Sequence, residues 1–383
     1  MKIALVCSEV IRESGHGRYM LELARRLAPD HEVHVYSHLY QPVPGAIHHP
    51  VSAPIGINLF RVFGFFLASS AALKGERYDI VHAIGGCTAR QDVVTAQFCQ
   101  RAWGEQLKHQ SAGSPAGGLA ARARRLYHEV YWRTTDMLEA RAFKTGPGRR
   151  LIAVSKGVRE ELARYYGADA SQVAVVYNGV EPGEFSAQAV AAHRESVRAE
   201  LGFGPDDRVL LFVGDFYRKG LGTVIRAMGA MKAERVKLLV VGRGEVEAFT
   251  AMAAEAGVAD KLTFVGFQPQ VVPYFAAADA FVFPTRYEPF GMVITEAMAA
   301  GLPVVTTASA GAAEVITPGV DGVILEDPDD ATALAEALDG LLADPVRMRE
   351  MGAAARETAR RVDWEYVTRA TLAVYADLLA SRR

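Results

Sequence analysis

The stretch Glu288-Pro-Phe-Gly-Met-Val-Ile-Thr-Glu296, which comes shortly after the apolar run Phe281-Val-Phe-Pro284, decides the fold. A short apolar run that leads through a turn into a helix is typical of a buried strand in a parallel sheet. The helix places Glu288 just before its N-terminus and Glu296 about two turns inside it. Both carboxylates are therefore expected beside the turn that follows the strand, where open α/β sheets bind ligands.

The turn between the two glutamates suits a phosphate, because the first N–H groups of a helix lack internal partners and carry partial positive charge. The backbone concerned is that of Phe290, Gly291, Met292 and Val293. Gly291 lets a ligand approach the chain closely. Since carboxylates accept hydrogen bonds from hydroxyls, the pattern indicates a ligand that is both phosphorylated and polyhydroxylated, such as a nucleotide-sugar. The alternative is two solvated glutamates on an amphipathic helix.

Length and composition restrict the possible domain number, function and location. A chain of 383 residues suggests two or three domains, and 50% hydrophobic residues can build sizeable cores. The formal charge of −2 argues against a general nucleic-acid binder. Three cysteines without ligand spacing fit a reducing compartment. The start, Met1-Lys-Ile-Ala-Leu-Val-Cys7, is too short for a signal peptide and is predicted to be a strand, so we expect a cytoplasmic protein.

Both halves of the chain show apolar runs that alternate with helical periodicity, which predicts two doubly wound parallel-sheet domains of the Rossmann-like type. The predicted strands are 2–7, 32–37, 79–84, 93–97, 151–155 and 173–177 in the first half, and 209–213, 237–241, 262–267, 280–284, 303–307 and 322–326 in the second. The predicted helices are 17–28, 55–73, 122–144 and 156–166, then 220–232, 245–257, 270–278, 291–300, 310–317 and 329–343.

The segment Tyr177-Asn-Gly-Val-Glu-Pro-Gly183 interrupts this pattern and is the expected linker. We therefore predict an N-terminal domain over 1–180 and a C-terminal domain over 184–363. The amphipathic helix at 364–383 follows the last strand and is expected to pack back on the first domain. Two such sheets facing each other would hold a ligand in the cleft between the domains. The small-residue stretch 111–118 is expected to be a mobile loop.

Two segments bear on membranes. Ile55 to Leu73 approaches the length of a spanning helix, but its Asn58, Arg61 and two serines favour a buried or interfacial helix. Residues 101–150 hold ten Lys or Arg against four acids, a local balance of +6, with interleaved aromatic residues. This stretch is a candidate docking surface for anionic lipid or an anionic acceptor; the alternative is a solvated helix face.

In the second half, cations and small residues follow several strands. Arg218 and Lys219 stand at a helix start, where they oppose the helix dipole unless an anion such as a pyrophosphate sits there. Arg243 lies in a tight turn after the next strand, for which turn chemistry is the alternative. After the fourth strand, Gly266 and Phe267 are placed to border a flat base, although Phe267 is equally suited to a core.

In the first half, Ser14-Gly-His-Gly-Arg18 lies between the first strand and its helix, so Gly15 and Gly17 would let backbone N–H groups approach a phosphate. The third glycine and the ribose acid of a dinucleotide fingerprint are missing, which argues against NAD or FAD. Asp327-Pro-Asp-Asp330 resembles a Mg²⁺ cluster but opens a helix, so N-capping explains it. We expect no metal site and no cofactor.

Taken together, the 288–296 motif, the Arg-Lys-Gly helix start, the glycine-rich turn after the first strand and the Asn-Gly-Val linker resemble family 4 of the retaining glycosyltransferases, which have the GT-B fold. The stretch Asp92-Val-Val-Thr-Ala-Gln-Phe-Cys99 and the basic region after it are similar, more weakly, to lipopolysaccharide core glucosyltransferases.

The resemblance implies a metal-independent hexosyltransferase that uses a nucleotide-sugar, by default a UDP-sugar, as its donor substrate. It implies that Arg218 and Lys219 neutralise the pyrophosphate, Glu288 binds sugar hydroxyls, and Glu296 holds the ribose. The backbone at Phe290, Gly291 and Met292 would contact sugar and phosphate, and Gly15 and Gly17 would close on the phosphates from the first domain.

Two departures from the family pattern stand out: Asp215 replaces an arginine, and Gln97 occupies a position near the reacting centre where many members have His or Asp. The implied acceptor is an unidentified hydroxyl, on a glycolipid or a cell-surface polysaccharide precursor. The alternatives are a nucleotide-sugar 2-epimerase of the same fold or a non-catalytic two-domain sugar-binding protein. A phosphorylase would need a lysine near the chain end, and none follows Lys261.

Overall fold

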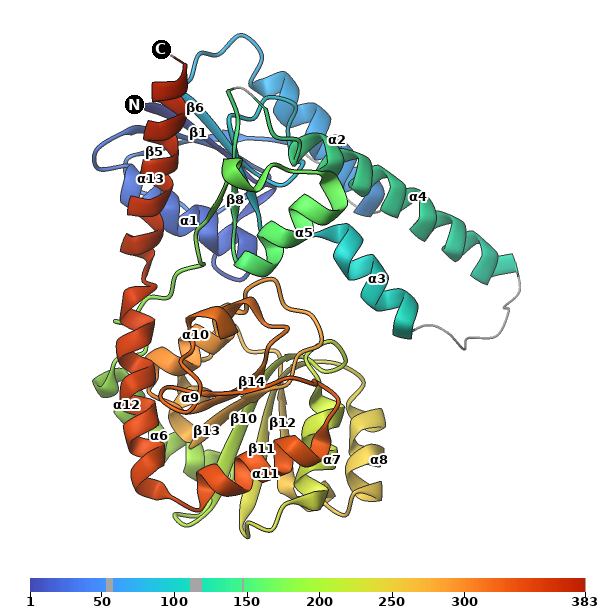
Figure 1. The fold of residues 1–383 in the computed structure, drawn as a ribbon, viewed down its shortest axis with the longest axis vertical. Coiled ribbons are helices and arrows are strands. Elements are labelled where there is room, and N and C mark those ends of the chain that lie inside the picture. The colour runs from blue at the N-terminus through green and yellow to red at the C-terminus, as the bar shows by residue number, and fades with distance from the viewer. Residues whose placement is uncertain (53–57, 111–118, 147, 383) are drawn as a thin grey trace. The chain divides into compact units, whose positions relative to one another are not determined.

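The computed structural model describes residues 1–52, 58–110, 119–146 and 148–382. The chain folds into two compact units (Figure 1). Unit 1 comprises Met1–Asn178 together with Trp364–Arg383, and unit 2 comprises Gly179–Asp363. The predicted mobile loop at 111–118 lies outside the described residues.

In unit 1, the described residues form a seven-stranded sheet in the order β5-β3-β1-β6-β7-β8-β9, in which every pair is parallel. Its central strands are almost completely apolar and buried, as expected for strands covered on both faces. The strands are β1 (Lys2–Val6), β3 (Glu32–Ser37), β5 (Ala46–Pro50), β6 (Ile80–Ile84), β7 (Val93–Ala96), β8 (Arg150–Ala153) and β9 (Val173–Val175), with a small pair β2 (Glu9–Val10) and β4 (Leu39–Tyr40) beside them.

The helices of unit 1 include one from the end of the chain. They are α1 (Gly15–Leu27), α2 (Asn58–Ala72), α3 (Gln100–Gln110), α4 (Leu119–Ala142), α5 (Lys156–Tyr166), the 3-10 turn Ala170–Gln172 and α13 (Trp364–Ser381). The helix α13 packs against α1, and Tyr375 of α13 reaches into the sheet, where its hydroxyl lies 2.6 Å from Nδ1 of His82. The other ring nitrogen of His82 lies 2.7 Å from Oγ1 of Thr95, so a buried polar chain ties α13 to β6 and β7.

Unit 2 has a six-stranded parallel sheet in the order β12-β11-β10-β13-β14-β15. Strands β10 and β11 pair over eight residues each, from Arg208 opposite Val236 to Asp215 opposite Arg243. The strands are β10 (Arg208–Asp215), β11 (Val236–Arg243), β12 (Leu262–Gly266), β13 (Ala280–Phe283), β14 (Val304–Thr307) and β15 (Val323–Leu325).

Helices cover this sheet, and a core that includes Phe212, Val240 and Leu338 lies between the layers. The helices are α6 (Ala187–Glu200), α7 (Leu221–Ala230), α8 (Val246–Glu255), α9 (Val272–Ala277), α10 (Met292–Ala299), α11 (Ala331–Leu342) and α12 (Pro345–Arg361), with 3-10 turns at Ala259–Lys261 and Gly311–Val315. The predicted architecture, two doubly wound parallel α/β sheets, is confirmed, and each predicted strand is present within a few residues.

Some elements differ from the prediction. The segment predicted as a helix at 310–317 forms only the 3-10 turn Gly311–Val315. The elements β5, α3, α6 and α12 were not predicted from the sequence. In β5, Ala-Ile-His-His-Pro lacks the apolar continuity of a central strand because β5 is an edge strand of the sheet.

Candidate functional site

Four neighbouring strands of unit 2 bring the predicted donor residues to one edge of the sheet. Because β12, β11, β10 and β13 are adjacent and parallel, their carboxyl ends share that edge. Phe267 follows β12, Arg243 ends β11, and Lys219 follows β10. Glu288 follows β13. Residues from four separate segments therefore meet where a doubly wound sheet binds its ligand.

The centre of this edge is an ion pair between Nζ of Lys219 and Oε2 of Glu288. The two side chains are only 8% and 14% exposed, so the pair is largely desolvated. The ammonium also lies over the ring of Phe283, 5.1 Å from its centroid. Burial and the adjacent guanidinium of Arg218 lower the pKa of Lys219 well below its ordinary value, while the Asp215 carboxylate acts in the opposite direction.

The turn that carries the two cations is held in place by its own backbone. The carboxylate of Asp215 accepts a hydrogen bond of 2.8 Å from the N–H of Arg218. Gly220, the N-cap residue of α7, has φ +84°, and a Cβ there would lie 2.1 Å from the carbonyl oxygen of Pro284. Only glycine fits this position, and it lets the turn pack against the end of β13.

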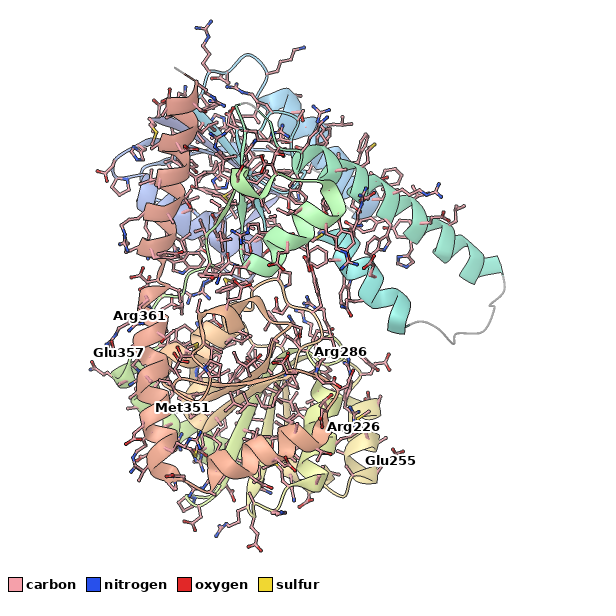
Figure 2. The ribbon with its side chains drawn as sticks, in the orientation of Figure 1. Arg226, Glu255, Arg286, Met351, Glu357 and Arg361 are labelled. Atoms are coloured by element: carbon pink, nitrogen blue, oxygen red, sulfur yellow. The ribbon has the colours of Figure 1, made fainter. Side chains whose placement is uncertain are left out.

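The carbonyl of Arg218 connects this turn to the segment before Glu288. It accepts from Oγ1 of Thr285 and from the backbone N–H of Arg286, each at 3.3 Å. The Arg286 side chain, labelled in Figure 2, donates to the carbonyl of Tyr217 at 2.8 Å and pairs with Asp329. The cationic turn and the Glu288 segment thus form one connected structure.

Glu288 itself sits on an extended segment that pairs with residues after β14. Its N–H donates to the carbonyl of Ser309 at 3.2 Å, and its carbonyl accepts from Gly311 at 2.9 Å. Gly291 then turns the chain into α10 with φ +95°; a Cβ there would lie 2.9 Å from Cγ of Glu288. Among the described side chains none caps α10 at Gly291, so the positive end of this helix stands next to Glu288.

Several of the predicted donor-binding residues are less exposed than the sequence suggested. Glu296 is 7% exposed and Lys219 is 6% exposed, although both were expected to face an open crevice rather than a core. Phe290 is buried as well, whereas Met292 and Val293 are half-buried. A substitution at Glu296 or Lys219 therefore acts on packing and desolvated charge in addition to any ligand.

Arg243 and Phe267 form a second feature of the same edge. The guanidinium carbon of Arg243 lies 4.1 Å from the centroid of the Phe267 ring, a cation–π contact. Phe267 is 47% exposed, so it is not a core aromatic, the alternative that the sequence left open. Gly266 before it has φ +71°, a conformation that glycine adopts readily.

The site residues predicted in the first half lie in unit 1. Gly15 is the first residue of α1, and the Ser14 side chain caps that helix by accepting from the N–H of Gly17 at 3.4 Å. A Cβ at Gly17 would lie 2.7 Å from the carbonyl oxygen of Glu9, so only glycine lets α1 start this close to β2. Gln97, after β7, exchanges two amide hydrogen bonds of 2.9 Å with Asn178.

The carboxylate cluster at 327–330 acts as a helix cap, as predicted. Asp330 accepts from the N–H of Ala333 at 2.8 Å at the start of α11, and Asp327 accepts from the N–H of Asp329 at 2.8 Å. Across the described ranges, no group of three or more His, Cys, Asp or Glu is placed to hold a metal ion.

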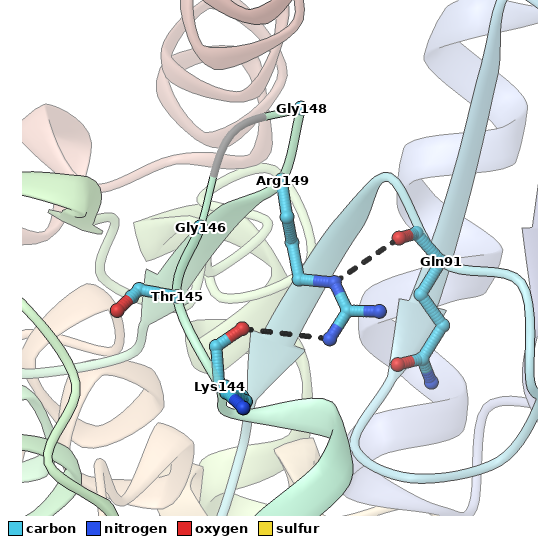
Figure 3. A pocket seen from close by; sticks show the side chains of 6 residues that line it. All are labelled: Gln91, Lys144, Thr145, Gly146, Gly148 and Arg149. Atoms are coloured by element: carbon cyan, nitrogen blue, oxygen red, sulfur yellow. Dashed lines mark hydrogen bonds between the residues drawn. The ribbon is translucent and has the colours of Figure 1, made fainter.

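A hollow of about 290 Å³ in unit 1 lies away from the strand ends that carry these residues. It is lined by residues that include Gln91, Lys144 and Arg149, just before β7 and β8 begin (Figure 3). The Arg149 guanidinium donates to the carbonyls of Gln91 at 3.3 Å and Lys144 at 3.5 Å. The Arg149 guanidinium therefore holds the segment that follows α4 in place, which is a structural role.

The carboxyl ends of β12, β11, β10 and β13, with the predicted donor-binding residues that follow them, are called the donor edge. The residues that support this edge were not predicted from the sequence. Asp215 was seen only as a departure from the family pattern, but it fixes the turn that carries Arg218. Thr285 and Ser309 were not singled out, although they anchor the Glu288 segment. Hydroxyl residues next to strand ends are too common to signal such roles, which depend on segments brought together by the fold.

Comparison with known proteins assigns both halves of the chain. The family model of Glycosyltransferase Family 4 matches residues 14–184, and that of Glycosyl transferases group 1 matches residues 193–358. An uncharacterized glycosyltransferase of Methanocaldococcus jannaschii is 27% identical over 84% of this chain and 84% of that protein. A D-inositol 3-phosphate glycosyltransferase of Segniliparus rotundus is 36% identical over 59% of this chain, which spans only 51% of that relative.

Solved structures agree on the fold. WaaG, a glycosyltransferase involved in lipopolysaccharide biosynthesis, superposes with a TM-score of 0.77 at 22% identity, covering 97% of this chain and 98% of that one. Anabaena HepE in complex with UDP-glucose gives a TM-score of 0.70 at 20% identity, with 100% of both chains covered. The two consecutive family matches and this shared GT-B architecture show that the chain belongs to family 4 of the glycosyltransferases.

Proposed function

We propose that the protein is a retaining hexosyltransferase that moves a sugar from a UDP-sugar to an acceptor hydroxyl. The observation that carries this proposal is the largely desolvated Lys219–Glu288 pair beside the start of α10, which no described side chain caps. A cation, an adjacent carboxylate and a helix N-terminus at one point match a ligand with a diphosphate joined to a polyol. In this proposal unit 2 holds the donor and unit 1 holds the acceptor.

The chemistry assigns a role to each group. Breaking the bond between sugar and phosphate places negative charge on the departing diphosphate, and fixed cations stabilise that charge. Lys219 and Arg218 supply these cations, and the N–H groups at the start of α10 add to them. Glu288 orients the sugar by accepting hydrogen bonds from its hydroxyls. Because side chains already provide the positive charge, the reaction is proposed to need no metal ion.

The nucleoside is proposed to lie along the same edge. Glu296 would accept from the ribose hydroxyls, and the half-exposed Phe267 ring under Arg243 offers a flat surface for the base. HepE, with the same fold, was crystallised with UDP-glucose, which supports uridine as the base. In unit 1, Gly15 and Gly17 are the proposed phosphate contacts, while Gln97, tied to Asn178, is proposed to position the acceptor.

A thermal-shift panel of UDP-, GDP- and ADP-sugars tests the donor assignment. A donor present at 100 times its Kd stabilises the folded state by about 2.7 kcal/mol, so the correct nucleotide should raise the Tm clearly above the others. We expect the UDP-sugars to give the largest shift, and Glu288→Gln to reduce it. Equal or absent shifts for all three nucleotides would contradict the proposal.

We further propose that the acceptor is membrane-borne and that unit 1 contacts the cytoplasmic face of an anionic membrane. Helices α2 and α4 pack together and expose large apolar side chains at helical spacing. These are Phe60, Phe63 and Leu67 on α2, and Leu126, Val130 and Met137 on α4. The surrounding stretch 101–150 has a charge balance of +6, which complements anionic lipid.

This contact would be peripheral. In the described parts of the chain, no helix combines the length and the apolar character needed to cross a bilayer. The side chains of Arg122, Arg124 and Arg125, which contribute to the basic stretch, lie outside those described. The apolar rows on α2 and α4 therefore carry the structural part of this proposal.

Cosedimentation with vesicles tests the contact. We expect binding to vesicles that contain anionic phospholipid, weaker binding to neutral vesicles, and a steep loss with salt. The double variant Phe60→Ser/Leu67→Ser should lower binding about tenfold or more, because apolar area no longer enters the interface. The matched control Val320→Ser changes a residue of unit 2 that is 55% exposed and should bind like the wild type. Equal binding to both vesicle types, or none, would contradict this proposal.

A further inference from the structure

Unit 1 contains a pocket of about 360 Å³ that the donor edge does not use. Its walls come from segments far apart in the sequence: the end of β1, the start of α1, the inner side of α2, the ends of β6 and β7, and α4. Gln97 and His16, which stands between Gly15 and Gly17, both line it. The pocket thus adjoins Gln97, which is proposed to position the acceptor, and the start of α1, where Gly15 and Gly17 are the proposed phosphate contacts.

The charges that line the pocket are mostly negative. Among the described residues around it, Arg61 is the single Lys or Arg, and its guanidinium lies 3.8 Å from the carboxylate of Glu9. Although His16 is exposed in the structure, desolvation beside the pocket lowers its pKa against the opposing effect of Glu9, which favours the neutral imidazole. Among the described lining residues, the cation available to a bound anion is therefore Arg61, which already pairs with Glu9.

The second acid in the wall, Glu139, is half-buried. It accepts hydrogen bonds from the N–H of Gln100 at 3.0 Å and from the hydroxyl of Tyr166 at 2.7 Å. Burial raises its pKa to about 7. Near neutral pH this group therefore exists partly as a carboxylate, which would repel a phosphate, and partly as an acid that can donate to a neutral hydroxyl.

The rest of the wall is apolar. Val62 and Phe65 of α2, Tyr131 and Leu138 of α4, and Phe143 after α4 contribute aliphatic and aromatic surface. Surface of this kind favours a ligand that brings a hydrocarbon part, since burial of each methylene group adds to affinity. Helices α2 and α4 thus present apolar residues on two sides, toward the pocket and on their exposed faces.

We propose that this pocket binds the acceptor as an uncharged glycoside with an apolar aglycone, and that it excludes phosphorylated polyols. The inference rests on the proposed transferase function and narrows its acceptor class. It separates this chain from the relatives named D-inositol 3-phosphate glycosyltransferase, whose named substrate carries a phosphate. Hydroxyls would pair with Glu9 and Glu139, and the aglycone would lie against Val62 and Phe65.

Three matched probes test the acceptor class by calorimetric titration of the whole chain: n-octyl β-D-glucoside below its micelle concentration, methyl β-D-glucoside, and glucose 6-phosphate. We expect the octyl glucoside to bind at least about tenfold more tightly than the methyl glucoside, because it buries several methylenes. Glucose 6-phosphate should bind more weakly than either. Binding of glucose 6-phosphate as tight as that of the octyl glucoside, or no binding of any probe, would overturn the proposal.

Two variants locate the bound glycoside. Val62→Asp places a charge in the apolar wall and should remove the advantage of the octyl over the methyl glucoside. Leu67→Asp makes the same kind of change on the exposed face of α2, where Leu67 is 52% exposed, and should keep that advantage. Loss of the advantage in Leu67→Asp but not in Val62→Asp would overturn the assignment to the pocket.

A third variant tests the exclusion of phosphate. In Glu9→Gln, the ratio of the affinity for the uncharged glucosides to the affinity for glucose 6-phosphate should fall by roughly tenfold, because one carboxylate near the bound anion is lost. Unchanged discrimination would contradict the electrostatic argument. The donor-induced thermal shift, measured on the same samples, separates the two proposals: a normal shift with failed acceptor binding refutes only this inference, while an absent shift refutes the transferase function.

Discussion

Removal of the Lys219 charge should affect stability and catalysis in separable ways. Lys219→Met keeps a long unbranched side chain but leaves the Glu288 carboxylate, 14% exposed, without its cation. Removing one partner of a buried ion pair costs about 3–5 kcal/mol of folding free energy. The loss of a cation that stabilises the leaving diphosphate should raise the barrier by about 3 kcal/mol, which lowers the rate on the order of a hundredfold.

A double-mutant cycle distinguishes the two effects. In Lys219→Met/Glu288→Gln no charge is left unpaired, so urea unfolding should recover most of the stability lost in Lys219→Met. Activity, measured as release of nucleoside diphosphate well below the Tm, should stay at or below the level of the single variant. Near-wild-type turnover in Lys219→Met, or recovery of turnover in the double variant, would refute the role of Lys219 as the diphosphate cation.

Four further predictions concern Glu296, the metal requirement, Tyr375 and His82. Glu296→Gln should raise the KM for the donor about tenfold or more by weakening contact with the ribose, and an unchanged KM would contradict that contact. Transfer should persist in excess EDTA, so complete loss restored by Mg²⁺ or Mn²⁺ would show that a metal is needed. Tyr375→Phe leaves Nδ1 of buried His82 without its partner, which should cost about 1–3 kcal/mol in urea unfolding; an unchanged midpoint would rule out a stabilising role. Burial lowers the pKa of His82 from 6.5 to about 3. Between these pH values the His82 imidazole is therefore neutral in the folded protein, whereas in the unfolded chain it is protonated. The contribution of His82 to the free energy of unfolding should therefore fall by up to about 1.4 kcal/mol per pH unit as the pH drops from 6.5 toward 3. His82→Gln should flatten this pH dependence of the free energy of unfolding.

The architecture was predictable because the strands of both sheets are short, continuous and apolar. A run such as Val304–Thr307, buried on both faces, admits few other interpretations. The edge strand β5 escaped prediction because its polar residues, including His48 and His49, are tolerated at an edge. The helix α12 escaped because its arginines, glutamates and alanines leave few large apolar residues to indicate a buried face, although Asp344 caps it.

The sequence allowed the residues of the donor edge to be predicted, but not the contacts between them. Phosphate chemistry at a helix start indicated Arg218, Lys219 and Glu288, since such residues follow strands that share one edge. That Lys219 pairs with Glu288, and that both are largely buried, depends on the packing of Gly220 against Pro284. The pocket of unit 1 could not be predicted, because its walls join segments from β1 to α4.

Proton NMR of UDP-glucose incubated with the protein tests the central claim most directly, because the three candidate functions leave different products. A retaining glycosyltransferase releases UDP and yields glucose, or a glucoside where an acceptor is present, whose first-formed anomer is α. We predict this outcome for the wild type, and a rate on the order of a hundredfold lower for Lys219→Met. A nucleotide-sugar that stays intact but becomes epimerised at C2, or one that binds and remains unchanged, would contradict the account.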